Sequence, residues 1–379
     1  MPVVSGGPSF VPPGSRRVGS RGPARASTVN LRDVARRAGV SIATASRVFS
    51  GRQSVKPDVK SAVLSAADEL GYVVNGLARS MMGRGARAVG VLVDTMVGPT
   101  FAALAAGVEA VASERGLLFQ LCTTRGDPER ERQLIDVLRE QRAAAVLLVG
   151  SAPTGPPEAA RVRKYARDMH AIDGRLVLCG RPAERTAPLA AAIDYDHFGG
   201  MYSATSHLLE LGHRHIAFIG ARRGFSTSES RLEGYRHAIA DSGVALPGKW
   251  VRPCEHSPES GEVATRRLLD EVAGITALVC ATDTIAIGAY RELRRRGIGV
   301  PQEISVVGFD DMMLVGELSP PLTTVRVPFE ELGRRAAAMG LGLDDPSRAV
   351  ILSTELVIRG STGPPSGVEA HGRARKTAL

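Results

Sequence analysis

The chain divides by its hydrophobic pattern into a short helical block and a long segment of alternating strands and helices. From Ala88 onward, continuous apolar runs predict buried strands at Ala88–Val93, Leu117–Leu121, Ala145–Val149, Leu176–Cys179, Ile216–Ile219, Ala277–Cys280 and Ile304–Val307. Apolar residues at helical spacing predict helices between them, at Thr100–Arg115, Asp127–Glu140, Gly199–Leu211, Arg231–Asp241, Gly261–Val272 and Asp283–Arg296. This alternation predicts parallel sheets covered on both faces. About 270 residues of it exceed one ordinary core, so we expect two doubly wound lobes.

The block at residues 28–74 predicts three short helices. Asn30 is a good N-cap for the first helix, Gly39 can take the positive φ that ends it, and Ser41 can cap a second helix over Ile42–Phe49. Pro57 suits the first turn of the third helix. The positions expected to face inward are apolar and recur at helical spacing: Leu31, Val34, Ala35, Val40, Ala45, Val48, Val63, Leu64, Ala67 and Leu70.

The beginning of the second helix offers an outward face suited to the major groove of DNA. Beside its cap Ser41, this face comprises Ile42, Ala43, Thr44, Ser46 and Arg47. A helix-turn-helix presents such a face to base edges, and Arg47 can donate two hydrogen bonds to guanine. The hydroxyls of Thr44 and Ser46 suit phosphates or helix caps. A plain three-helix bundle would have the same spacing, so the spacing leaves both interpretations open.

The distribution of charge favours the DNA-binding interpretation. The net charge is +9, and residues 1–90 carry fourteen basic against four acidic residues, whereas the remainder is nearly neutral. A basic head on a neutral body is typical of proteins that bind the phosphate backbone. The arginines between Arg16 and Arg25 could equally belong to a solvated tail.

Several classes of protein are disfavoured by what the sequence lacks. Residues 1–27 and 362–379 have no hydrophobic periodicity, so we expect disordered tails and no secretory signal. No apolar run approaches the length of a membrane span, and the four cysteines form no CxxC pair. The common nucleotide-binding, nucleophile-elbow and zinc-protease motifs are also missing. We therefore expect a cytoplasmic protein that is not an enzyme and needs no cofactor, metal or membrane.

Two segments near the N-terminus resemble a known family. LRDVARRAGVSIATASRVFSG is similar to the helix-turn-helix of the lactose-repressor (LacI/GalR) family, and GYVVNGLARSM is similar to its hinge. The resemblance implies that the hinge folds on operator DNA, pairs with a dimer mate in the minor groove and opens a base step with an apolar side chain. The matched hinge positions are Asn75, Leu77, Ala78 and Met81, and Met81 stands where the family has leucine.

The resemblance continues to about Gly360, through stretches such as SRLEGYRHAI and ATDTIAIGAYRELRRRGIGVPQEISVVGFDD. It implies a body of two lobes like those of periplasmic binding proteins, joined by three crossing strands, with the ligand between them. We expect a hinge and linker at 75–87 and a body at 88–361. The lobe nearer the head is expected at 88–189 and 321–345, and the distal lobe at 190–320 and 346–361.

The resemblance also assigns an effector site. Its matched positions are Phe101, Arg181, Arg231, Asp283 and Asp310. Carboxylates and guanidinium groups each engage two adjacent hydroxyls, which suits a sugar. Other roles stay open: Asp283 could cap a helix, Asp310 could cap a turn, Arg231 could pair with a surface acid and Phe101 could be core. His256 stands where the family often has a stacking aromatic side chain.

The sequence thus predicts a transcriptional repressor that binds pseudo-palindromic operator DNA as a homodimer, or as a tetramer, under control of a small effector. A sugar, a sugar acid and a nucleoside all remain possible effectors. The main alternative is a solute-binding protein with the same body, which would carry a secretory signal and no basic helix-turn-helix. Activation in place of repression stays open too, because the sign of allosteric coupling depends on which state the effector prefers.

Overall fold

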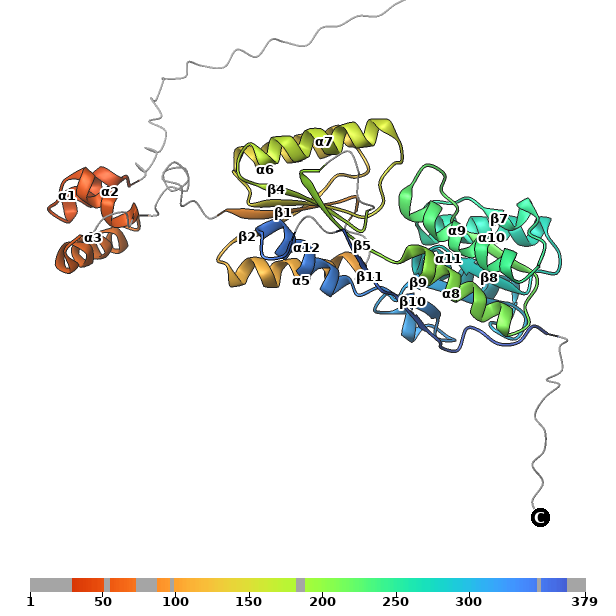
Figure 1. Cartoon of the computed structure of the whole chain (residues 1–379). Coiled ribbons are helices and arrows are strands. Elements are labelled where there is room, and N and C mark those ends of the chain that lie inside the picture. Colours follow the sequence, from red (N-terminus) through yellow and green to blue (C-terminus); the bar gives the residue numbers. More distant parts are fainter. Residues whose placement is uncertain are drawn as a thin grey trace, which may run out of the picture. The chain divides into compact units, whose positions relative to one another are not determined.

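The computed structural model describes residues 29–50, 55–72, 87–95, 99–181, 188–345 and 349–366. Contacts divide the chain into two units, Met1–Gly85 and Ala86–Leu379, which hold the head and the body (Figure 1). The predicted hinge positions Asn75, Leu77, Ala78 and Met81 lie outside the described residues. No helix in the described ranges is long and apolar enough to cross a lipid bilayer.

The head contains three helices, α1 (Leu31–Arg37), α2 (Ile42–Ser50) and α3 (Pro57–Glu69). The Asn30 side chain accepts hydrogen bonds from the backbone N–H groups of Arg32 and Asp33, and the Asp33 carboxylate accepts from the Asn30 N–H at 3.0 Å. Ser41 Oγ accepts from the Thr44 N–H at 3.0 Å, and Gly39 has φ +67°. The predicted caps and the turn therefore form, because each depends on residues within one helical turn.

The core of the head corrects one predicted position. Val34, Ala45 and Val63 are fully buried, as the spacing indicates, but Leu64 is 46% exposed. Ala66 takes its place in the core. Leu64 follows Val63 by about 100° around α3 and so turns away from the face shared by Val63 and Ala66.

The body contains two six-stranded sheets, one in each lobe. Lobe 1 has the strand order β11-β5-β4-β3-β1-β2, with β1 (Ala88–Val93), β2 (Leu118–Thr123), β3 (Ala145–Val149), β4 (Arg175–Cys179), β5 (Ala190–Tyr195) and β11 (Val350–Leu352). Lobe 2 has the order β12-β10-β9-β8-β6-β7, with β6 (Ile216–Ile219), β7 (Val251–Arg252), β8 (Ala277–Cys280), β9 (Ser305–Asp310), β10 (Thr323–Arg326) and β12 (Glu355–Val357). All pairs are parallel except that of β10 with β12.

Helices cover the sheets in pairs. In lobe 1, α6 (Pro128–Glu140) and α7 (Pro156–His170) lie on one face, and α5 (Pro99–Glu114) and α12 (Phe329–Leu341) lie on the other (Figure 1). In lobe 2, α8 (His197–Glu210) packs with α9 (Ser226–Asp241), and α10 (Pro258–Glu271) packs with α11 (Asp283–Arg296). The two-lobed α/β architecture predicted from the apolar runs is confirmed.

Three local predictions about the body need correction. Helix α9 begins at Ser226, so Arg231 lies in its second turn and not at its start, as the predicted range Arg231–Asp241 had it. Strand β5 pairs with β4 in lobe 1, and β11 pairs with β5, although the predicted boundaries place both strands in the distal lobe. Strand β10 pairs with β9 in lobe 2 instead of lobe 1. The chain therefore crosses between lobes after β5, β10 and β11, because a strand belongs to the sheet that satisfies its backbone hydrogen bonds.

Candidate functional site

The early part of helix α2 forms the first candidate surface. Ile42 is 45% exposed and Ala43 and Arg47 are exposed, while Ala45 on the opposite side is fully buried. Ser41 Oγ lies 2.9 Å from Thr44 Oγ1 as well as binding the Thr44 backbone, so these two hydroxyls are engaged in the helix cap. Ser46 is half-buried one turn later. The predicted DNA-facing residues thus share one side of α2, with Arg47 as its cationic group.

The second candidate is a cavity of about 130 Å³ between the lobes. Most of its lining follows the carboxyl ends of strands or belongs to helices that start there, which is where doubly wound sheets bind ligands. Lobe 1 and the packed helix α12 contribute Thr100, Phe101, Leu104, Val149, Gly150, Ser151, Cys179, Gly180, Tyr195, Phe329 and Leu332. Lobe 2 contributes Thr227, Arg231, His256, Thr282 and Asp310.

Arg231 is the most highly connected side chain of this cavity. Its guanidinium donates hydrogen bonds to the Ala281 carbonyl at 2.5 Å, to Tyr195 Oη at 3.1 Å and to Asp310 Oδ1 at 3.0 Å. Its Nε donates to His197 Nδ1 at 3.2 Å. The residue is only 3% exposed. Because Tyr195 ends a strand of lobe 1 while Arg231 belongs to lobe 2, this group ties the two lobes together.

The side chains around Arg231 hold it in one orientation. The guanidinium lies 3.8 Å from the centre of the Phe309 ring, a cation–π contact. His197 lies between Arg231 and Asp194, with Nε2 3.1 Å from Asp194 Oδ1. Burial lowers the pKa of His197, so the neutral ring accepts from Arg231 through Nδ1 and donates to Asp194 through Nε2. The side chain of Arg231 is therefore fixed in place before any ligand arrives.

Asp310 sits at a strained turn at the end of β9. Its φ is +113° and that of Asp311 is +51°, both in a region that side chains other than glycine rarely adopt. Asp311 fixes the turn by binding Arg326 at 2.8 Å and Arg359 at 2.7 Å. Strain of this kind clusters at ligand sites, where the surrounding structure holds a side chain in a required position.

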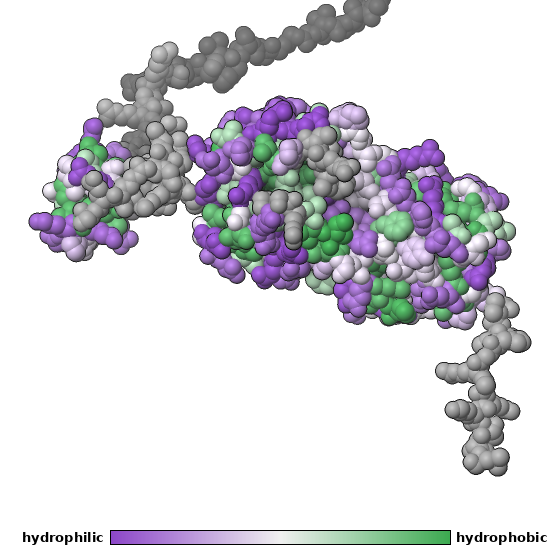
Figure 2. Space-filling view, viewed as in Figure 1, coloured by the Kyte–Doolittle hydropathy of each residue, from purple (hydrophilic) through white to green (hydrophobic). Residues whose placement is uncertain are grey.

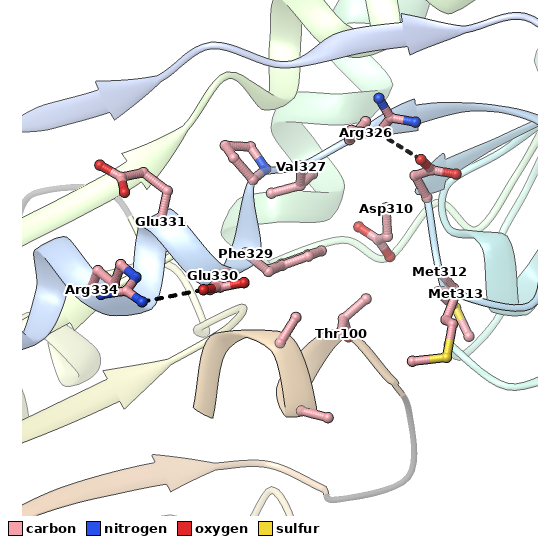
Figure 3. Close-up of a pocket in the computed structure, with 14 residues that line it drawn as sticks. Thr100, Asp310, Met312, Met313, Arg326, Val327, Phe329, Glu330, Glu331 and Arg334 are labelled. Atoms are coloured by element: carbon pink, nitrogen blue, oxygen red, sulfur yellow. Dashed lines mark hydrogen bonds and ion pairs between the residues drawn. The ribbon is translucent and has the colours of Figure 1, made fainter. Parts of the chain in front are cut away.

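A wider groove of about 740 Å³ adjoins the cavity and shares Thr100, Asp310 and Phe329 with it. Figure 3 shows the Asp310 carboxylate on one side of this groove, with Thr100 and the Phe329 ring facing it from α5 and α12. The shared residues make the groove an approach to the cavity. Asp310 therefore stands where the approach meets the cavity.

The structure brings three of the five predicted effector positions together and leaves two outside. Phe101, Arg231 and Asp310 line the cavity. Arg181 is buried behind its wall, where Nε donates to the Gly150 carbonyl at 2.8 Å and Nη1 lies 3.4 Å from a Glu158 carboxylate oxygen.

Asp283 is fully buried and lies outside the cavity lining. Its carboxylate accepts from the Met312 N–H at 2.8 Å and from the Thr324 hydroxyl at 2.5 Å. The helix cap is Thr282, whose hydroxyl accepts from the Ile285 N–H at 3.3 Å. Burial, together with Asp310, raises the pKa of Asp283 well above its usual value. Asp283 thus neither caps α11 nor lines the cavity. Its two hydrogen bonds instead link the segment that follows β9 to strand β10.

Polar lining residues that were not among the predicted effector positions complete the cavity. Ser151, Thr227 and Thr282 supply hydroxyls, and Ser151 Oγ is buried without a hydrogen-bond partner among the described residues. A buried hydroxyl without a partner is costly, so it favours a ligand or water at this point. Ser151 and Thr282 closely follow apolar strands in the sequence, and the rule that ligands lie beyond strand ends is the signal that could have found them.

Comparisons with known proteins agree with this architecture. Residues 30–75 match the model of bacterial regulatory proteins of the lacI family, and residues 205–362 match the periplasmic binding protein-like domain. The chain is 34% identical over 345 residues to the HTH-type transcriptional regulator GalR of Escherichia coli, covering 90% of this chain and 98% of that protein.

Two solved structures extend the likeness. The transcriptional regulator CelR in its complex with cellobiose is 31% identical in sequence to this chain, and its structure matches with a TM-score of 0.64. This match covers 88% of this chain and 99% of that chain. The lac repressor dimer bound to operator and the anti-inducer ONPF is 26% identical in sequence to this chain, with a TM-score of 0.74. This match covers 89% of this chain and 100% of that chain. Both likenesses include residues of the head as well as of the body.

Proposed function

Because this chain belongs to the lacI family of bacterial regulatory proteins, we propose that α2 reads an operator and that an uncharged polyol in the cavity between the lobes controls it. The family consists of DNA-binding transcriptional regulators and not of enzymes. The observation that carries the proposal is the pairing of Arg231 with Asp310 at the cavity, in a chain that also has a basic helix-turn-helix.

The proposal for the head rests on its exposed basic helix. Arg47 lies in the last turn of α2 on the exposed side, and Ile42 and Ala43 leave a short apolar surface beside it. One short helix contacts too few base pairs to specify an operator, so we propose that a homodimer presents two such helices to a pseudo-palindrome. The lac repressor structure similar to this chain is a dimer on its operator.

An Arg47→Ala variant should lose discrimination at one base pair in each half-site, by about 1–3 kcal/mol, because a bidentate contact to guanine is removed. Selection of binding sites from a random duplex pool, followed by affinity measurement on single-base variants, checks this. Lys60→Ala is the control and should weaken binding to all duplexes alike. Equal losses for Arg47→Ala on selected and random DNA, or a selected site without two-fold symmetry, would contradict the proposal.

The charge of the cavity supports an uncharged ligand. Arg231 and Asp310 neutralise each other at 3.0 Å. The side chain of His256 is exposed, and the surrounding protein, followed by the charges of Arg231 and Arg222, lowers its pKa, so the ring is neutral at pH 7. Arg181 lies outside the lining and near Glu158. The lining therefore offers no unpaired positive charge to the carboxylate of a sugar acid. We accordingly favour a neutral sugar over a sugar acid as the effector.

The size and chemistry of the lining narrow the proposal further. A cavity of about 130 Å³ is small beside the roughly 300–1,000 Å³ sites that hold drug-sized molecules, so the cavity suits a single sugar ring. The hydroxyls of Ser151, Thr227 and Thr282 can exchange hydrogen bonds with ring hydroxyls, and the rings of Phe101 and Phe329 offer apolar faces.

A thermal-shift screen of neutral monosaccharides and the corresponding sugar acids should find stabilisation by a neutral sugar. At about 100 times its Kd, such a ligand stabilises the protein by about 2.7 kcal/mol. The Asp310→Asn variant keeps an acceptor for Arg231 and a side chain that tolerates positive φ, so it should fold but lose the shift. Stabilisation by sugar acids alone, or a full shift with Asp310→Asn, would contradict the assignment.

A further inference from the structure

A separate hollow of about 500 Å³ lies at the opposite edge of the lobe 1 sheet, where β1, β3 and β4 begin. Its charged and titratable lining consists of Arg87, Arg115, His170, Asp173 and Arg175. We call this hollow the basic groove. It shares no lining residue with the effector cavity, so it requires an explanation of its own.

The basic groove carries an excess of positive charge. Three arginines face one aspartate, and none of the three arginines has a carboxylate within 4.0 Å among the residues described in the structure. Elsewhere in the body many arginines are paired, such as Arg132 with Glu129 and Arg296 with Asp270. An uncompensated group of guanidinium charges in a concave surface attracts anions.

Arg87 has a structural role that accounts for its own position. Its guanidinium donates to the carbonyls of Arg142, Ile172 and Asp173 at 3.2, 3.3 and 2.9 Å. These carbonyls follow the C-terminal ends of α6 and α7, where an arginine is a favourable cap. Arg87 therefore contributes a fixed positive charge at the edge of the groove and is not itself a good probe of ligand binding.

Arg115 and Arg175 have no such role. Both side chains are exposed, and neither guanidinium forms a hydrogen bond or ion pair with another described residue. A methyl group added at Gly342 would come within 2.0–2.9 Å of the Arg175 guanidinium, so that guanidinium rests on the turn that ends α12. The two side chains present guanidinium donors at the groove that no described group satisfies. Guanidinium donors bind phosphate oxygens in a bidentate manner.

The groove lies at the start of the body, close along the chain to the segment that follows the head. Arg87 directly precedes β1 and follows the segment that joins the body to the DNA-reading head. The groove is therefore tethered to any duplex that the head has bound. We propose that Arg115 and Arg175 of the basic groove bind backbone phosphates of the DNA beside the operator. This proposal rests on DNA binding by the head and adds a contact from the body that is independent of base sequence.

The salt dependence of DNA binding tests this contact. With the full chain and a random duplex, log K should fall linearly with log salt concentration, with a slope of about 0.9 per neutralised phosphate. The Arg115→Gln/Arg175→Gln variant should lower the slope by about 1.8 per docked protomer, which corresponds to roughly 60-fold weaker binding at 0.1 M salt. Arg115→Lys/Arg175→Lys retains the charges and should restore most of the slope. Both positions are exposed, so these variants should fold normally.

Two comparisons make the result decisive. Arg236→Gln/Arg267→Gln removes the same charge from exposed positions on α9 and α10 of lobe 2 and should leave the slope unchanged. An unchanged slope in the groove variant, or an equal loss in the control variant, would overturn the proposal while leaving DNA binding by the head intact. Saturable heat on titration with inorganic phosphate that is lost in the groove variant, with no change of slope, would assign the groove to a free anion and also overturn it. A wild-type protein without salt-dependent binding would instead refute the function of the head.

Discussion

An Arg231→Ala variant is expected to lower the free energy of unfolding of the body by about 3–5 kcal/mol, because it leaves a buried carboxylate without its partner. Arg231 is 3% exposed and binds Asp310, Tyr195, His197 and the Ala281 carbonyl. Urea denaturation checks the value. The fluorescence of Trp250 reports on lobe 2, because it is the single tryptophan of the chain and is buried beside β6.

A double variant distinguishes the cost of one unpaired buried charge from the contribution of the ion pair itself. Arg231→Leu/Asp310→Asn removes both charges and should recover part of the stability, because no uncompensated charge remains in the interior. A loss below about 1 kcal/mol for Arg231→Ala would mean that water reaches Asp310 freely and that the network is weak.

The expected loss of stability also affects how effector experiments on Arg231 variants are interpreted. A lost response in Arg231→Ala can reflect a damaged interface between lobes, so Asp310→Asn is the cleaner test of ligand contact.

A Gly333→Ala variant is expected to destabilise lobe 1 by about 3 kcal/mol, the upper end of the usual cost of overpacking. A methyl group at Gly333 would lie 2.1 Å from the Leu104 carbonyl oxygen, and one at Gly107 would lie 2.1 Å from the Glu330 carbonyl oxygen. Helices α5 and α12 thus cross with their backbones in contact. Because the obstacle is backbone and not a flexible side chain, the helices must separate to admit the methyl group.

The same crossing positions the effector cavity. The cavity lining includes Phe101 and Leu104 from α5, and Phe329 and Leu332 from α12. If the two helices move apart, the ligand-induced thermal shift should therefore also become smaller. Gly248→Ala is the matched control, since no heavy atom lies within 4 Å of its added methyl group, and it should change stability by less than about 1 kcal/mol. Denaturation followed by far-ultraviolet circular dichroism measures both variants. Similar stabilities for the two would show that the crossing relaxes without cost.

Local patterns in the sequence were enough to predict much of this protein. The strands Ala88–Val93, Ala145–Val149, Ile216–Ile219 and Ala277–Cys280 match their predicted bounds, because a continuous apolar run is itself the signal for a buried parallel strand. The Asn30 and Ser41 caps formed because both their donors and acceptors lie within a few residues. The family also followed from short motifs, since each motif combines a turn, a cap and a core position over a few residues.

Only the tertiary structure decided matters that depend on distant partners. Arg181 turns away from the cavity because Glu158 and the Gly150 carbonyl lie behind the wall, and Asp283 is occupied by Met312 and Thr324. Strands β5, β10 and β11 join the sheets that complete their hydrogen bonds, which no local pattern reveals. Periodicity and capping act over a turn or two of chain, whereas the partner of a buried charge or of a strand is set by folding. The local features could therefore be predicted from the residues, whereas the composition of the cavity could be predicted only in part.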